Sequence, residues 1–557
     1  MSKVVLVCFR DAKEDARYRL SLRVLADRLA PDNISPSPPR VEGCNEGVLI
    51  LSINPNDTLS IKNSSVCLGH IVNPRGDWWK PGAEAPDGSY ALFRSDDRHV
   101  ELLTDVVASR TIWYAKTDDC FLASSSQRAI VSFLQNFQPN YDASLWMLSS
   151  GSLGPGQSWD RRICCLCGDS RLRLNRATWS ISNEAAPVII DPIDLSTEEH
   201  EARLNEALAR TFENLHLDYS NWVLPLSGGF DSRALLLMLK NRSNLQTITW
   251  GLKSSMTRPN SDAFVARSLA DRLKVRHRYF ELDTTNGSIE TAFERFLLMG
   301  EGRTDWFGGY TDGFSLWKTL FDEKILGIIR GDEGFGWNVV RNNYEVKVSI
   351  GAIGIEDLWQ LDAVAGLGMH MLGNQRWPDS FRRRESESLS SWRDRLYHQW
   401  RIPFRLAALN ELKTSYVEVV NPFLSREIIA VIRTMPDSLR TNKTLFRRIV
   451  ENLGPRIEFA KFQSIPERDD VLSGDTARRL ITDELSSSYA TSLLPVEFLR
   501  RLRDKMNNID GNAGQSRSVP VRQTVGAFVK LLAFRAYMIC RMNRLMIADG
   551  DALKDHF

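Results

Sequence analysis

Residues 224–233, Leu-Pro-Leu-Ser-Gly-Gly-Phe-Asp-Ser-Arg, combine the residue types that hold a phosphate group. An apolar run leads into two glycines, which let backbone N–H groups approach an anion closely. The hydroxyls of Ser227 and Ser232 can donate hydrogen bonds, and the start of the helix expected after Asp231 favours negative charge. The lysine of a Walker loop is missing, and the pattern is not the GxGxxG of dinucleotide sites. The segment therefore predicts a phosphate-binding loop.

Asp231 implies that a cation binds beside this loop, because a lone carboxylate would repel a phosphate. Mg²⁺ is commonly held by one or two carboxylates together with phosphate oxygens. A second acid is offered by Gly331-Asp332-Glu333-Gly334, which follows the apolar segment 325–329. We predict Asp231 and Asp332 as magnesium ligands.

Strand and helix patterns alternate around both acidic loops. Helices are expected after Asp231, over about 261–273 and near 290–299, because apolar residues recur there at helical spacing. Such alternation predicts a doubly wound parallel sheet, which binds ligands at the carboxyl ends of its strands. Short apolar runs place the strands at 222–226, 247–250, 278–282 and 325–329.

The first ~185 residues differ, because short apolar runs are interrupted there by turn residues, as in a sheet-rich domain. Ser196 and Glu199 then form a capping-box pattern at the start of a helix. We predict domains at 1–190 and 191–557. The late apolar stretch 525–546 contains four basic residues, so it reads as a core helix and not as a membrane span.

Composition narrows the function classes further. The net charge is +2, from 71 Lys and Arg against 69 Asp and Glu, which gives no basic field for nucleic acid or membrane. The eight cysteines have no paired CxxC frame. Sparse cysteines and the absence of a signal-peptide pattern favour the cytoplasm.

The loop at 224–233 resembles the pyrophosphate loop of the asparagine synthetase B superfamily. Residues 248–252 are similar to the family's adenine-lining strand, and 331–335 to its second acidic loop. Glu418 to Leu424, with Lys443 and Arg447, resembles its C-terminal helical signature. The resemblance implies an ATP-pyrophosphatase that adenylates a carboxylate, releases pyrophosphate and transfers the acyl group to an amine. It places ATP on Leu226, Ser227, Gly228, Gly229, Asp231, Ser232, Trp250 and Gly331, and makes Lys461 the catalytic lysine of a late loop.

The N-terminal half resembles the family's class II glutaminase, an Ntn-hydrolase-like β-sandwich, through 87–92, Asp105 and 121–125. Position 2 is Ser2, where a glutaminase needs a nucleophilic cysteine. We therefore expect a degenerate glutaminase-like domain. Relatives without that cysteine include β-lactam synthetases and the macrolactam cyclases of lasso peptides. Ile329 stands where the family's asparagine synthetases have a Glu and its β-lactam synthetases a Tyr, so the general base is unassigned.

The leading hypothesis is ATP- and Mg²⁺-dependent macrolactam formation on a lasso-type precursor peptide, as in antibiotic biosynthesis, with AMP as by-product. That resemblance implies two partners, a leader-peptide-binding protein and a precursor protease. One alternative is amidation of a small carboxylate with free ammonia or another amine, and another is a non-catalytic scaffold of the same fold. A tRNA-modifying pyrophosphatase is disfavoured, because the chain has neither a basic stripe nor paired zinc cysteines.

Overall fold

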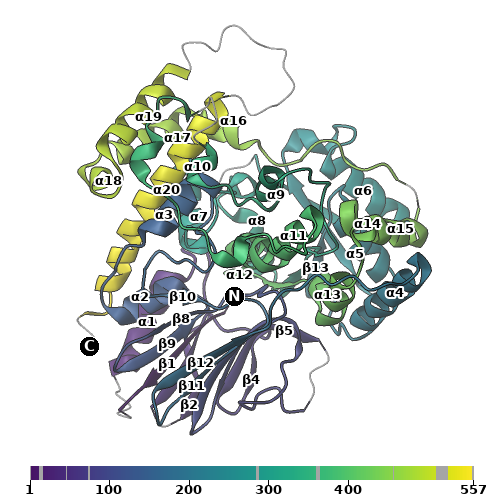
Figure 1. Ribbon diagram of the computed structural model, residues 1–557, viewed down its shortest axis with the longest axis horizontal. Coiled ribbons are helices and arrows are strands. Elements are labelled where there is room, and N and C mark those ends of the chain that lie inside the picture. The colour runs from purple at the N-terminus through teal and green to yellow at the C-terminus, as the bar shows by residue number, and fades with distance from the viewer. Residues whose placement is uncertain are drawn as a thin grey trace.

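The computed structural model describes residues 2–11, 17–45, 47–72, 76–283, 288–358, 364–455, 457–509 and 525–554. These residues form two antiparallel sheets from the first part of the chain, one parallel sheet, and helices around them (Figure 1). The mixed α/β class expected from the sequence is confirmed.

The two antiparallel sheets pack face to face. Strand β1 (Lys3–Phe9) shows why, because its side chains alternate between two cores. Val4 and Leu6 lie between the sheets with residues of both, whereas Val5 and Val7 face helices α1 (Arg17–Leu29) and α2 (Gln127–Leu134). The kinship of this sandwich to Ntn hydrolases stays a prediction.

Each antiparallel sheet has six strands in the described residues. The first runs in the order β10 (Cys164–Cys165), β8 (Trp113–Lys116), β9 (Cys120–Ser124), β1, β3 (Val48–Ile53) and β2 (Arg40–Asn45). The second runs in the order β12 (Ser180–Ala185), β11 (Ser170–Asn175), β7 (His99–Thr104), β6 (Asp87–Ser95), β5 (Ser65–Val72) and β4 (Ser60–Lys62).

The parallel sheet is the part of the fold that positions the candidate site. Its order is β15 (Arg276–Glu281), β14 (Gln246–Gly251), β13 (Trp222–Pro225), β16 (Gly327–Ile329) and β17 (Glu418–Val420). The chain order reverses between β13 and β16, and ligands bind at such a switch point in doubly wound sheets. The strand predictions are confirmed to within two residues, except that β17 was not predicted.

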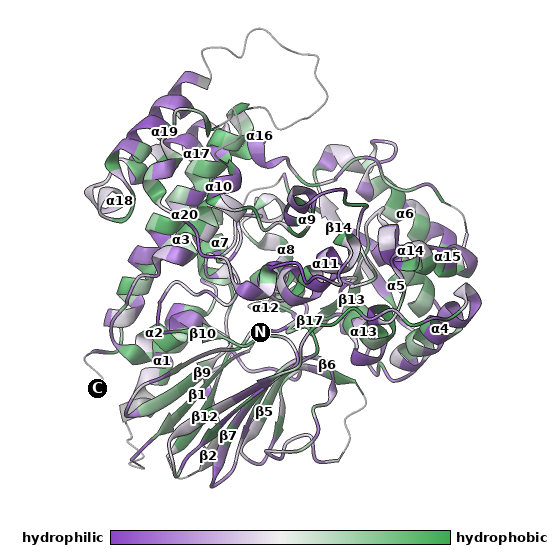
Figure 2. Ribbon diagram, in the orientation of Figure 1, coloured by the Kyte–Doolittle hydropathy of each residue, from purple (hydrophilic) through white to green (hydrophobic). Residues whose placement is uncertain are grey.

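Helices α5 (Phe230–Leu239), α6 (Asp262–Leu273) and α7 (Ile289–Gly300) follow β13, β14 and β15. Helix α4 (Thr197–Glu213) begins with the predicted capping box, in which Glu199 N–H donates to Ser196 Oγ at 3.2 Å. The hydropathy of two of these helices matches their positions (Figure 2). Helix α5, beside the sheet, is mostly hydrophobic, and α4, on the outside, is mostly hydrophilic. The division into domains at 190/191 stays a prediction.

The predicted C-terminal helix is α20 (Val525–Asp551), which is 27 residues long. It packs against α17 (Asp475–Leu485) and α19 (Val496–Ile509) and also against α2 and α3 (Tyr141–Ser150) (Figure 1). The C-terminal helix therefore contacts two helices from the first part of the chain. None of the helices in the described ranges is long and apolar enough to cross a membrane.

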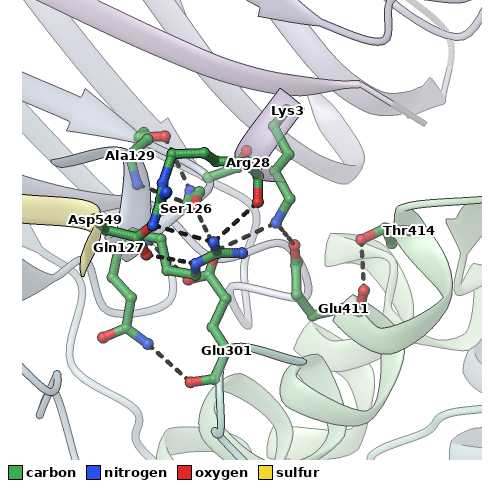
Figure 3. Close-up of polar contacts among 12 residues, drawn as sticks. Lys3, Arg28, Ser126, Gln127, Ala129, Glu301, Glu411, Thr414 and Asp549 are labelled. Atoms are coloured by element: carbon green, nitrogen blue, oxygen red, sulfur yellow. Dashed lines mark hydrogen bonds and ion pairs between the residues drawn. The ribbon is translucent and has the colours of Figure 1, made fainter. Parts of the chain in front are cut away.

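Buried ion pairs join the sandwich to the rest of the chain (Figure 3). Lys3 Nζ lies 3.3 Å from Glu301 and 3.4 Å from Glu411, which stands on α12 (Ala407–Thr414). At the other end of the network, Asp549 of α20 binds Arg128 at 2.7 Å and Arg28 at 2.8 Å. Helix α12 therefore connects the N-terminal strand to the edge of the parallel sheet.

Candidate functional site

The predicted phosphate loop turns between β13 and α5 at the switch point of the parallel sheet. Ser227 N–H donates to Ser232 Oγ at 3.0 Å, and Gly229 N–H donates to Ser227 Oγ at 3.1 Å. Gly229 caps α5 without a side-chain hydrogen bond. The first N–H groups of α5 therefore have no side-chain cap and can bind an anion.

Gly228 and Gly331 leave room for neighbouring segments that pack closely against them. A Cβ on Gly228 would lie 2.4 Å from the Cβ of Ala460, whose N–H donates to Gly228 O at 3.0 Å. A Cβ on Gly331 would lie 3.1 Å from the carbonyl carbon of Asp231. The two acidic loops expected from the sequence are thus in contact.

Asp231 is held by a lysine from much later in the chain. Lys443 Nζ lies 2.7 and 2.8 Å from the two carboxylate oxygens of Asp231 and 2.9 Å from Glu333. Burial alone would lower the pKa of Lys443, but the two carboxylates outweigh it and raise that pKa. Burial raises the pKa of Glu333 to about 7. Lys443 is therefore a buried cation at the phosphate loop.

Sequence reasoning placed Lys443 only in a helical signature and missed this role. The side chain of Lys443 is 9% exposed and that of Glu333 is 3% exposed. Lys443 itself adopts a left-handed backbone conformation, φ 58°, just before α15 (Thr444–Leu453). The one available signal was the Thr-Asn-Lys turn before an amphipathic helix.

Asp332 follows β16 and is held by two other side chains. Arg330 Nη2 lies 3.1 Å from its carboxylate, and Asn410 Nδ2 of α12 donates to it at 2.7 Å. A π-helix, η6 (Tyr397–Leu406), leads directly into α12. Such segments recur at functional sites.

The two carboxylates fit a magnesium ion that binds together with a nucleotide. No cluster of three or more His, Cys, Asp or Glu side chains suited to a metal is present in the described part of the chain. Asp231 and Asp332 both line the cavity over the phosphate loop, and a magnesium ion held by them would take its remaining ligands from phosphate oxygens and water.

A cavity of about 450 Å³ opens over both loops. Its lining contains seven of the predicted residues, namely Leu226, Ser227, Asp231, Ser232, Trp250, Gly331 and Asp332. Gly228 and Gly229 form the turn beneath it. Residues 463–465 line another part of the cavity. A hydrogen bond holds this segment to the start of α6, because Ser464 Oγ accepts from Ala263 N–H at 2.7 Å.

A second cavity, of about 320 Å³, adjoins the first. The two share the lining residues Trp250, Trp306, Arg330, Gln463 and Ile465. The lining of the second cavity also contains Tyr310, Lys413 and Arg468, which do not line the first cavity. One continuous cleft therefore offers a chamber beside the phosphate loop and another beyond it.

Lys461, the predicted catalytic lysine, is exposed and lies outside the lining of both cavities. Its backbone N–H donates to Asn260 O at 2.8 Å, which fixes the late loop beside the start of α6. Its catalytic role stays a prediction. Arg468 lies in the second cavity and forms an ion pair with Asp305 at 3.4 Å.

Two further positions bear on the amine. Ile329 is fully buried in β16, so it offers the cleft no polar group. Ser2 is 1% exposed and donates from its hydroxyl to Asn54 O at 3.2 Å. Its hydroxyl is thus buried and hydrogen-bonded to the backbone.

The asparagine synthase family model matches residues 203–311. The matched segment contains the phosphate loop and Trp250 and ends before Gly331. The match supports kinship with the asparagine synthetase family and, in general terms, ATP-dependent amidation or ligation. No curated protein matches the chain.

Proposed function

We propose that the protein uses ATP to activate a substrate carboxylate as an acyl-adenylate and closes an amide with an amine of the same substrate. The proposed product is a macrolactam, and the proposed substrate is a lasso-type precursor peptide. The observation that carries this proposal is the pair of joined cavities, one against the phosphate loop and one against aromatic and basic side chains. Adenylation needs such adjoining places for nucleotide and acyl group.

In the first step, the loop N–H groups and the hydroxyls of Ser227 and Ser232 bind the β- and γ-phosphates. Lys443 lies against Asp231 and neutralises charge there as pyrophosphate separates. Asp231 and Asp332 would hold Mg²⁺, which neutralises and orients the phosphates when bound. A carboxylate oxygen of the substrate attacks the α-phosphorus, and the bond from that phosphorus to pyrophosphate breaks.

In the second step, an amine attacks the acyl carbon and the acyl–phosphate bond breaks, so AMP leaves. The acyl group lies where the two cavities meet, beside Arg330 and between Trp250 and Trp306. An amine carried by the same substrate has the advantage of proximity, worth about 7–11 kcal/mol when the reactants are well oriented.

The buried hydroxyl of Ser2 supports an amine that arrives with the substrate and not from glutamine. A glutaminase nucleophile must meet its substrate, and this side chain is 1% exposed. The proposed partners, a leader-peptide-binding protein and a precursor protease, would deliver the peptide with a free N-terminus.

One observation favours a second candidate, the amidation of a small carboxylate with free ammonia or another amine. The second cavity measures about 320 Å³, at the lower end of the range for small-molecule sites. The scaffold alternative is weaker, because both acidic loops, Lys443 and the open cleft are all in place.

The test is to supply purified protein with Mg-ATP and synthetic peptides that carry an N-terminal amine and an internal Asp or Glu. A product that is one water lighter, formed with AMP and without added ammonia, supports cyclisation. Asp332→Asn should abolish it, and Lys116→Met, at an exposed position in β8, serves as the comparison. A product that appears only when ammonia is added would contradict cyclisation and support the second candidate.

A further inference from the structure

Lys413 is a buried lysine in the second cavity, and it has no role in the steps derived above. It stands on α12 one turn after Asn410, which holds Asp332. Its residue is 4% exposed, yet it belongs to the lining of the cavity. Lys413 Nζ donates to Leu409 O of its own helix at 2.6 Å.

The surroundings of Lys413 disfavour its charged form. Among the described residues, no carboxylate forms an ion pair with it. Burial is the largest effect and the positive charge of Arg330 adds to it, so the pKa of Lys413 falls well below its usual value, although Asp332 acts in the opposite sense. Nζ also lies 5.7 Å from the ring centres of Tyr310 and Trp317.

The rings of Tyr310 and Trp317 stabilise the charged form of Lys413 only weakly. A cation–π contact acts within about 6 Å of the ring centre, so both contacts lie near the limit of that range. Burial is the largest effect on the pKa of Lys413, and it disfavours the charged form. Burial therefore favours the uncharged form of the Lys413 amine, and the residue lines the second cavity.

The other titratable groups of this cavity are poor bases. Arg330 and Arg468 offer guanidinium groups, which are hydrogen-bond donors and not acceptors. Burial raises the pKa of Tyr310, so its hydroxyl keeps its proton. Glu467 is exposed to solvent at the rim. Ile329, in the position where the resemblance led us to look for a base, offers none.

We propose that Lys413 is the general base of amide formation. As the substrate amine bonds to the acyl carbon and the bond to AMP breaks, the nitrogen loses a proton to the lone pair of Lys413 Nζ. AMP departs with the electron pair of the broken bond, and Lys413 returns its proton to solvent after the product leaves. This assignment rests on the proposed adenylation.

The state of Lys413 can be measured without any substrate, by competitive acetylation of the full chain with acetic anhydride at pH 6–10. Mass spectrometry would compare Lys413 with the exposed Lys461 in the same sample. We expect half-maximal labelling of Lys413 at least about two pH units below that of Lys461. Labelling of Lys413 only above pH 10, or no labelling at all, would overturn the proposal.

The catalytic part is tested with the peptide that supports turnover, using Lys413→Met and Lys413→Arg. General bases contribute about 10²–10⁴-fold. We expect amide formation to fall at least about 100-fold more than ATP–pyrophosphate exchange. We also expect hydroxylamine, which is neutral at pH 7, to release AMP at similar rates from variant and wild type.

Equal losses of exchange and amide formation, or no loss of either, would refute the role of Lys413. If the wild type makes no AMP and pyrophosphate with any peptide, the proposed function fails instead, and the acetylation result still decides the state of Lys413. The two failures are therefore distinguishable.

Discussion

Lys443→Met removes the cation that bridges Asp231 and Glu333, and its cost can be estimated from the geometry. Losing one partner of a buried ion pair costs about 3–5 kcal/mol. The Asp231 side chain is 32% exposed and can turn to water, whereas Glu333 is 3% exposed and cannot. We therefore expect the lower end, about 3 kcal/mol.

For a large domain, about 2 °C is lost per kcal/mol, so the melting temperature should fall by about 6 °C. Differential scanning calorimetry in metal-free buffer measures this, with Lys461→Met as the matched control because Lys461 is exposed. Exposed substitutions change stability by about 0.5 kcal/mol or less. Millimolar Mg²⁺ should recover part of the loss only in Lys443→Met, where the acids lack a cation. A loss below about 1 kcal/mol, or equal losses in both variants, would refute the bridging role of Lys443.

Three other substitutions test the loop, the link between layers and the response to acid. Gly228→Ala should weaken ATP binding at least about tenfold by equilibrium dialysis, because its Cβ would lie 2.4 Å from that of Ala460 and overpacking costs about 1–3 kcal/mol. Asp549→Asn should lower the free energy of unfolding by about 3–5 kcal/mol in urea, since it leaves the buried Arg128 unpaired. His398→Gln should reduce the loss of stability between pH 7 and 5, because burial and then Arg433 lower the His398 pKa to about 3. That depressed pKa contributes stability above pH ~6.5, and about 2 kcal/mol of it is lost by pH 5.

Each of these substitutions has its own control. Gly76→Ala adds a Cβ with nothing within 4 Å and should leave ATP binding unchanged. Asp551→Asn, at the exposed end of α20, should change stability by about 0.5 kcal/mol or less. If Gly228→Ala binds ATP as tightly as wild type, the loop does not need a glycine at that position. If Asp549→Asn and Asp551→Asn have the same free energy of unfolding, the ion pair between Asp549 and Arg128 does not stabilise the fold. If His398→Gln loses as much stability between pH 7 and 5 as wild type, that loss does not come from protonation of His398.

The parts of the site that local sequence encodes were predictable. The turn at Ser227–Ser232 depends on glycines and hydroxyls within one loop, and α6 begins at Asp262 because Ser261 caps it. Strand β17 was missed, because three residues are too short to show a period. Lys443 could not be placed, since 212 positions separate it from the carboxylate it binds.

Lys413 was missed for a related reason. Its sequence neighbours, in Asn-Glu-Leu-Lys-Thr, read as an ordinary helix surface. It is buried only because α12 packs between the N-terminal strand and the edge of the parallel sheet. Lys461 shows the opposite case. The sequence resemblance predicted it as a site residue, and the fold leaves its side chain exposed.

The proposed reaction in this cleft splits ATP between the α- and β-phosphates to activate a carboxylate. The most direct measurement is the nucleotide product formed from Mg-ATP labelled at the α-phosphate, with and without peptide, in wild type and Asp231→Asn. We predict peptide-dependent AMP and pyrophosphate in the wild type and neither in the variant. ADP and phosphate, or AMP formation that Asp231→Asn leaves intact, would contradict this account.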